Sequence, residues 1–148
     1  MNLPRYEYLT ESEAELFKFT SEGVKGSIKK LVVYSIMLEN DVYNLAFGDY
    51  DEQTNSINDT VITNNNDSQK VLATVASTLY VFTDKHPNVW VYATGSNTAR
   101  TRLYRIGITT NLEAILEDFE VFGLSGEAWR EFEKGKEYEA FLVKRKLH

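Results

Sequence analysis

The chain has 148 residues, a formal net charge of −6 and no cysteine. Its length supports one hydrophobic core and predicts a single domain over residues 1–148, while the missing cysteines exclude disulfides, thiolate metal sites and cysteine nucleophiles. We predict a cytoplasmic protein with no membrane contact, because the sequence starts without a leader pattern and has no long apolar run. The negative charge argues against non-specific nucleic-acid binding.

The first third of the chain predicts an antiparallel meander. Leu16, Phe17 and Phe19 are typical of an edge strand, which a turn near Gly23 would end. β-Branched and apolar residues then predict three further strands, at 28–37, 41–50 and 57–63.

The hydrophobic period changes after residue 64, which predicts a helix. Asn66 or Asp67 is the expected N-cap, and the end is expected near Lys85 because residues before a proline such as Pro87 avoid helical angles. The residues expected to face the core are Val71, Leu72, Val75, Leu79 and Phe82. A strand at 89–94 follows.

A second helix is predicted after Gly95, with Ser96 or Asn97 as its N-cap. Its expected inner face consists of Ala99, Leu103 and Ile106. Gly107 is the expected residue just beyond its end.

A capping box from Thr110 to Glu113 predicts another short helix or turn. Two last strands are expected at 120–124 and 138–144, on either side of a loop that carries Trp129 and Phe132. Behind the N-terminal edge strand, the order is therefore β-β-β-α-β-α-β-β, an α/β (α+β) fold with a single-layer mixed, mainly antiparallel sheet and two main helices. The strands at 57–63 and 89–94 are expected to be parallel neighbours.

The most distinctive local feature is a basic run in an acidic chain. Arg100, Arg102 and Arg105 are half of the six arginines, and no carboxylate lies between Gly95 and Gly107. We expect them to share one solvated helix face with Tyr104, a face that suits a phosphate or carboxylate. Surface ion pairs with acidic neighbours are the alternative.

The pattern Asn97-x5-Leu103-Tyr104-x2-Gly107 and the element order resemble the Gcn5-related N-acetyltransferase fold. That resemblance implies acetyl-CoA or CoA as cofactor, with Asn97 and Tyr104 beside the thioester and Tyr104 as the acid that protonates the thiolate. A tyrosine that simply packs its ring is the other interpretation.

The chain departs from that family in the loop that binds the pyrophosphate, where TNNNDSQKVL replaces its glycine-rich sequence. Asn65 and Asn66 tolerate left-handed conformations and Lys70 adds a positive charge, so these residues are candidates for a substitute anion site.

Three stretches, VYNLAFGDYDEQT, KVLATVASTLYVFTDKHP and YATGSNTARTRLYRIGI, resemble an uncharacterised domain family found mainly in Bacteroidetes. This second resemblance covers nearly the whole chain and implies no particular chemistry.

Other polar residues predict structural roles. The spacing of Asp49, Asp51 and Asp59 lacks the continuation of a calcium loop, so no metal site is expected. His86 is expected to stabilise the end of the first helix.

Three functions are left open by the sequence. The first is a degenerate acyl-CoA-dependent N-acyltransferase-like protein. The second is a non-enzymatic binding module for a small anionic ligand, a nucleotide or a protein, for example in a toxin–antitoxin or phage-defence gene pair. The third is a structural partner subunit. The candidate ligand-binding residues are Ser96, Asn97, Arg100, Arg102, Arg105, Asn65, Asn66 and Lys70.

Overall fold

The structure, a computed structural model, describes residues 4–11, 15–37, 39, 41–58 and 63–147. Within these residues the helices are α1 (Ser68–Lys85), α2 (Thr98–Thr110) and α3 (Leu112–Asp118). The strands are β1 (Leu9–Glu11), β2 (Leu16–Gly23), β3 (Gly26–Ile36), β4 (Val42–Asp51), β5 (Ser56–Ile57), β6 (Trp90–Ala93), β7 (Phe119–Ser125), β8 (Ala128–Glu131) and β9 (Ala140–Arg145). No helix in the described ranges combines the length and apolar character that a membrane crossing requires.

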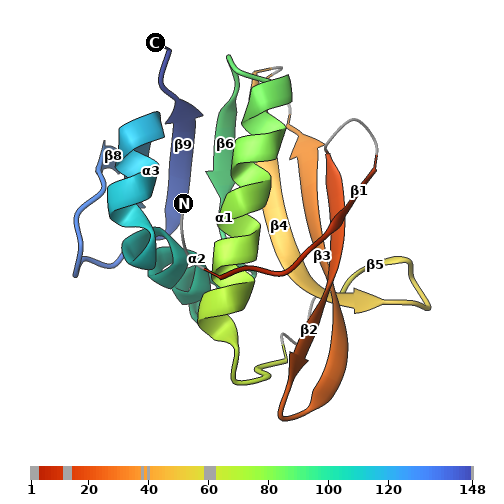
Figure 1. Cartoon of the computed structure of the whole chain (residues 1–148). Coiled ribbons are helices and arrows are strands. Elements are labelled where there is room, and N and C mark those ends of the chain that lie inside the picture. Colours follow the sequence, from red (N-terminus) through yellow and green to blue (C-terminus); the bar gives the residue numbers. More distant parts are fainter. Residues whose placement is uncertain (1–3, 12–14, 38, 40, 59–62, 148) are drawn as a thin grey trace.

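The strands form one open sheet in the order β1-β2-β3-β4-β6-β9-β7-β8, and β5 pairs with β4. Among the described residues each strand pair is antiparallel except β4 with β6, which is parallel. Figure 1 shows α1, α2 and α3 in front of the sheet. The predicted mixed, mainly antiparallel sheet and its opening meander are confirmed.

The parallel neighbour of β6 differs from the prediction. We expected the stretch 57–63 beside β6, but β4 takes that position, with Val42 opposite Trp90 and Asn44 opposite Tyr92. The start of the predicted stretch instead folds back on β4, where Ile57 pairs with Tyr50 after a turn that places Asn55 at a φ of 55°. Residues 59–62 lie outside the described residues.

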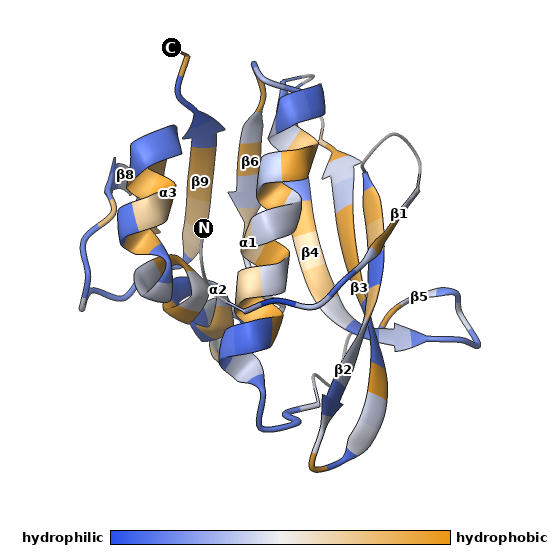
Figure 2. Ribbon diagram, in the orientation of Figure 1, coloured by the Kyte–Doolittle hydropathy of each residue, from blue (hydrophilic) through white to orange (hydrophobic). Residues whose placement is uncertain are grey.

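The core lies between the sheet and α1. All five residues of the predicted α1 stripe are buried, and the helix ends at Lys85 as predicted. Tyr34 of β3 stacks on Phe82 of α1, with ring centroids 4.1 Å apart. Hydrophobic residues are concentrated in β4 and β9, beneath the helices (Figure 2). This packing fixes the position of α1 on the sheet, and α2 in turn packs against α1.

The inner face of α2 differs from the prediction. Leu103 is half-buried and Ile106 is 40% exposed, whereas Arg100 and Tyr104 turn inward. Positions i, i+4 and i+7 share one side of a helix, and here that side begins with Arg100 and Tyr104 and ends at Gly107. The predicted period was correct, but polar residues and a glycine occupy the inner side.

Gly107 lies inside α2 and not beyond its end, because the helix continues to Thr110. A Cβ added to Gly107 would lie 3.2 Å from the Cδ2 atom of Leu72 in α1, so this glycine allows the two helices to approach closely.

The predicted capping box does not form. Asn111 occupies the N-cap position of α3 without a side-chain cap, and its Nδ2 atom donates to the Gly107 carbonyl oxygen at 2.7 Å. Strand β8, which contains Trp129, was predicted as loop, whereas the strands at 120–124 and 138–144 correspond to β7 and β9.

Candidate functional site

The turn between β6 and α2 is fixed by close contacts. Asn97 is the N-cap of α2, as predicted, and its Oδ1 atom accepts a hydrogen bond from the Arg100 backbone N–H at 2.9 Å. The Gly95 N–H donates to the Thr101 hydroxyl at 3.0 Å, and a Cβ on Gly95 would clash with the Thr101 backbone nitrogen. These contacts hold the first turn of α2 against the end of β6.

The structure divides the basic run between two sides of α2. Arg100 and Tyr104 are each 9% exposed and face the sheet, while Arg102 and Arg105 lie on a more exposed side. The expected single solvated face with four polar groups is therefore wrong. The reason is geometric, since the i, i+4 pair Arg100 and Tyr104 occupies the inner side of the helix.

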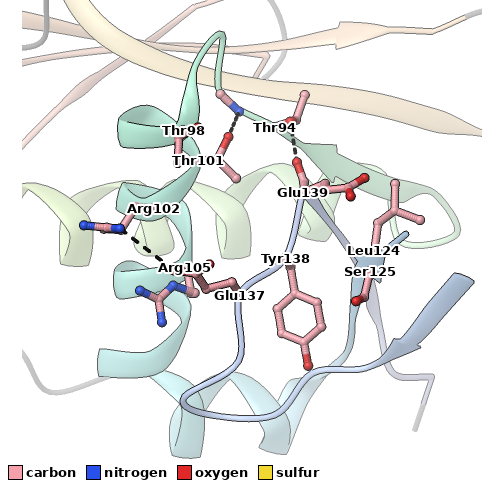
Figure 3. A pocket seen from close by; sticks show the side chains of 11 residues that line it. Thr94, Thr98, Thr101, Arg102, Arg105, Leu124, Ser125, Glu137, Tyr138 and Glu139 are labelled. Carbon is pink, nitrogen blue, oxygen red and sulfur yellow. Dashed lines mark hydrogen bonds and ion pairs between the residues drawn. The ribbon is translucent and has the colours of Figure 1, made fainter. Parts of the chain in front are cut away.

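Arg102 and Arg105 line a pocket of about 430 Å³ between α2 and the segment that leads into β9. We call it the arginine pocket. Figure 3 shows Arg102 and Arg105 one above the other on α2, with Glu137 beside them and Ser125 on the opposite side. Its other lining residues are Thr94, Gly95, Thr98, Thr101, Leu124, Tyr138 and Glu139. It lies at the carboxyl end of β6, the edge at which open α/β sheets usually bind ligands.

The two arginines in this pocket are weakly paired. Arg102 approaches Glu137 at 3.9 Å, and both side chains are largely exposed, at 56% and 81%. Such a pair adds little stability and is easily exchanged. The Arg105 side chain forms no hydrogen bond or ion pair with any other described residue. Two guanidinium groups are thus available at the mouth of one pocket, with the hydroxyls of Thr98 and Ser125 nearby.

The Tyr104 hydroxyl is bound to the sheet. It donates to the Leu45 carbonyl oxygen at 3.3 Å and accepts from the Phe47 N–H at 3.2 Å, both in β4. These backbone groups lie beyond Asn44, where the pairing between β4 and β6 ends. Burial raises the pKa of Tyr104 to about 12, partly offset by the hydrogen bond from Phe47, so the phenol is neutral at physiological pH.

The predicted anion site before α1 is occupied by internal contacts. Asn65 is 1% exposed, and its side chain accepts from the Lys25 N–H and donates to the Gly26 carbonyl oxygen. Asp67 accepts hydrogen bonds from the hydroxyls of Tyr6 and Ser21, at 2.5 Å each.

Asn66 and Lys70 have different surroundings from Asn65. Asn66 has a φ of 60°, in line with the left-handed tolerance predicted for it, and Lys70 lies over the Tyr6 ring at 4.3 Å. Neither residue lines the arginine pocket, and nor does Asn65.

The carboxylates of β4 also have internal roles. Asp49 accepts hydrogen bonds from the ammonium group of buried Lys30 and from the Thr63 N–H at 2.9 Å. Burial favours the protonated form of Asp49, but these hydrogen bonds outweigh it and the pKa lies below its ordinary value. Asp51 accepts from the Gln53 N–H, and Asp59 lies outside the described residues. In the part of the chain that the structure describes, no three His, Asp or Glu side chains are placed to hold a metal ion.

His86 caps the C-terminus of α1 and stacks on Phe82, with ring centroids 4.7 Å apart. Ser96 is exposed and lines a second pocket on the other side of the β6–α2 turn, together with Arg100 and Tyr104.

Sequence reasoning found Arg102 and Arg105 but missed most of the pocket around them. Thr98, Ser125 and Glu137 come from α2, β7 and the segment before β9, and none carries a local signal in the sequence. Only the order of the strands, which places β9 between β6 and β7, brings them together.

The chain belongs to the family of unknown function DUF6934, whose model matches residues 2–146. This confirms the predicted membership of an uncharacterised domain family. No curated protein and no solved structure matches the chain significantly.

Proposed function

We propose that this chain is a non-enzymatic binding module that recognises a phosphate-type anion in the arginine pocket. The observation that carries this proposal is the presence of two guanidinium groups, Arg102 and Arg105, in a pocket where one is weakly paired and the other has no partner among the described residues. Guanidinium groups match the oxygens of a phosphate in geometry and charge.

The formal charges of the lining residues balance, because Glu137 and Glu139 offset the two arginines, but neither glutamate holds an arginine tightly. Glu137 is mostly in water, and its 3.9 Å contact with Arg102 is long for an ion pair, so an incoming phosphate replaces a weak interaction with a stronger one. The backbone of Glu139 stabilises this side of the pocket, because its carbonyl oxygen accepts a hydrogen bond from the Thr94 hydroxyl at 2.8 Å.

The surroundings of Tyr104 and Asn97 support binding over catalysis. The resemblance to the acetyltransferases assigns both side chains to the thioester, but Asn97 caps α2 and Tyr104 satisfies the backbone of β4. An acid that must reach a thiolate needs its hydroxyl within hydrogen-bond distance of it. Here the Tyr104 hydroxyl is hydrogen-bonded to backbone groups of β4 that have no β6 partner. A ligand would have to displace the Tyr104 side chain to reach those groups.

A CoA-dependent acyltransferase is the second candidate, and one observation favours it. The parallel pairing of β4 with β6 covers three residues only, after which β4 continues beside β3 but without β6, and a pantetheine chain needs such a separation. If β1, β5, β8 and α3 are counted as additions, the element order is the β-β-β-α-β-α-β-β order expected for an acetyltransferase-like scaffold. For both candidate functions the location we propose is the cytoplasm.

The experiment is a thermal-shift titration of the purified protein with phosphate, pyrophosphate, nucleotides, CoA and acetyl-CoA, with sodium chloride at equal ionic strength as reference. A ligand that binds only the folded state raises the unfolding midpoint. The proposal predicts a rise with pyrophosphate or nucleotide. Arg102→Ala/Arg105→Ala should weaken that binding at least about hundredfold, since each of the two charged hydrogen bonds lost contributes about 1.5–3 kcal/mol.

Arg130→Ala is the matched control, because Arg130 is an exposed arginine of β8 that does not line the pocket. It should respond to pyrophosphate as the wild type does. A rise with CoA or acetyl-CoA alone would favour the acyltransferase. No rise with any phosphate compound would contradict the proposal and leave a protein partner as the function to seek.

A further inference from the structure

A second pocket, which we call the strand-gap pocket, lies on the other side of the β6–α2 turn. It has a volume of about 550 Å³ and opens where β4 continues beyond its last β6 partner. Its walls include Leu16, Val33 and Ala46, which alternate along their strands with the core residues Phe17, Tyr34 and Phe47. Side chains alternate between the two faces of a sheet, so this pocket opens on the face opposite the helices.

One charged side chain lies in this site, whose walls are partly apolar and partly polar. Arg100 lines the strand-gap pocket, is 9% exposed, and donates a single hydrogen bond, from Nη2 to the Asn58 carbonyl oxygen at 2.7 Å. A guanidinium group has five N–H donors. Among the described residues no carboxylate forms an ion pair with Arg100.

Two other cations with restricted exposure have carboxylate partners. Lys30, whose side chain is 1% exposed, pairs with Asp49, and Arg145, whose side chain is 24% exposed, pairs with Asp84 at 3.1 Å. A buried charge is costly unless an opposite charge and hydrogen bonds compensate it. Since no described residue supplies such a charge to Arg100, an anion bound in the pocket would balance it.

We propose that the strand-gap pocket binds a small monocarboxylate, whose carboxylate pairs with Arg100 and whose apolar body lies against Leu16, Val33 and Ala46. One arginine balances one negative charge, so a phosphate dianion would leave a second charge without a cation among the lining residues. Uncharged molecules would leave the guanidinium without a counter-ion. The ligand class therefore differs from that of the arginine pocket, and this inference does not depend on the proposed function.

The test is a calorimetric titration of the full chain with octanoate, octanamide and octyl phosphate. Octanamide has the same body without the charge, and octyl phosphate has the same body with a larger charge. Octanoate should bind about tenfold to hundredfold more tightly than octanamide, the range for a charged hydrogen bond, and more tightly than octyl phosphate.

Two variants locate the site. Arg100→Met keeps much of the side-chain volume and should reduce octanoate affinity to that of octanamide. Ala46→Phe fills the pocket from β4 without changing Arg100 and should weaken both ligands at least tenfold, with an unchanged circular dichroism spectrum. Arg102→Ala/Arg105→Ala is the control and should bind octanoate as the wild type does.

Equal affinity of the wild type for octanoate and octanamide would overturn the proposal, as would no binding of octanoate. Tighter binding of octyl phosphate than of octanoate to Arg102→Ala/Arg105→Ala, which lacks the cations of the arginine pocket, would refute the monocarboxylate assignment. Retained selectivity in Arg100→Met, or unchanged octanoate binding in folded Ala46→Phe, would place the ligand elsewhere on the molecule.

Discussion

Lys30 and Arg100 are both largely removed from water, but the chain treats them differently. Lys30 of β3 lies opposite Asp49 of β4, and its ammonium group donates to that carboxylate and to the Thr63 carbonyl oxygen at 3.0 Å. Arg100 of α2 donates to one backbone carbonyl and has no carboxylate partner among the described residues. A described carboxylate therefore balances the charge of Lys30, whereas no described carboxylate balances that of Arg100.

This difference separates structural cations from those that suit a ligand. A buried pair whose lone pairs and protons are all used fixes the geometry of the segments that it joins. A cation that the chain leaves without a counter-charge, whether buried like Arg100 or partly exposed like Arg105, is suited to an anion from outside. Both proposed sites adjoin the β6–α2 turn, where such cations gather.

The largest expected effect comes from Lys30→Met, which would leave the Asp49 carboxylate buried without its cation. We expect the free energy of unfolding to fall by about 3–5 kcal/mol, measured by urea denaturation. Lys30→Met/Asp49→Leu, which removes both charges, should recover most of that loss. A single variant within about 1 kcal/mol of the wild type would show that the pair contributes little.

Tyr104→Phe should have a smaller effect. It removes the hydroxyl that is hydrogen-bonded to the Leu45 carbonyl oxygen and the Phe47 N–H, and leaves these two backbone groups of β4 without that partner. We expect a loss of about 1–3 kcal/mol in urea denaturation. No loss would mean that the strand groups find other partners, and the hydroxyl would then be free for other chemistry.

Acid should weaken the Lys30 region selectively. The pKa of Asp49 is lowered in the folded protein, so its contribution to stability is present above its ordinary value of 3.8 and is lost as the pH falls through the folded value. The stability difference between the wild type and Lys30→Met/Asp49→Leu should therefore shift in favour of the variant below pH 3.8. A difference that does not change with pH would contradict the account of this pair.

Arg100→Met should have the smallest effect on the ligand-free protein, within about 1 kcal/mol in either direction, because only one hydrogen bond is lost and an uncompensated buried charge is removed. Urea denaturation without added anions measures it. A loss as large as that of Lys30→Met would make Arg100 a structural cation and remove the distinction between the two regions.

The sequence predicted the parts of the fold that depend on local pattern. The meander, the stripe and end of α1, the cap at Asn97 and the last two main strands follow from hydrophobic period and capping chemistry. The neighbour of β6 could not be predicted, because the short β5 turns back on β4 and the choice between two candidate strands depends on long-range packing.

The candidate site was predicted only in part, for a similar reason. The spacing of Arg100, Arg102 and Arg105 identifies a basic helix but not which side of it faces the sheet. Packing of Gly107 against Leu72 and insertion of Tyr104 at the end of the β4–β6 pairing decide that orientation. These tertiary contacts turn Arg100 inward and leave Arg102 and Arg105 at the pocket.

The central claim, an anion site at Arg102 and Arg105, is tested most directly by an NMR titration of the ¹⁵N-labelled protein with pyrophosphate, observing backbone amides and arginine Nε–H groups. The proposal predicts saturable shifts of the Arg102 and Arg105 Nε–H signals and of the Thr98 and Ser125 amides, absent with sodium chloride at equal ionic strength. Shifts confined to the start of α1, around Asn66 and Lys70, or no saturable shift of either arginine, would contradict it.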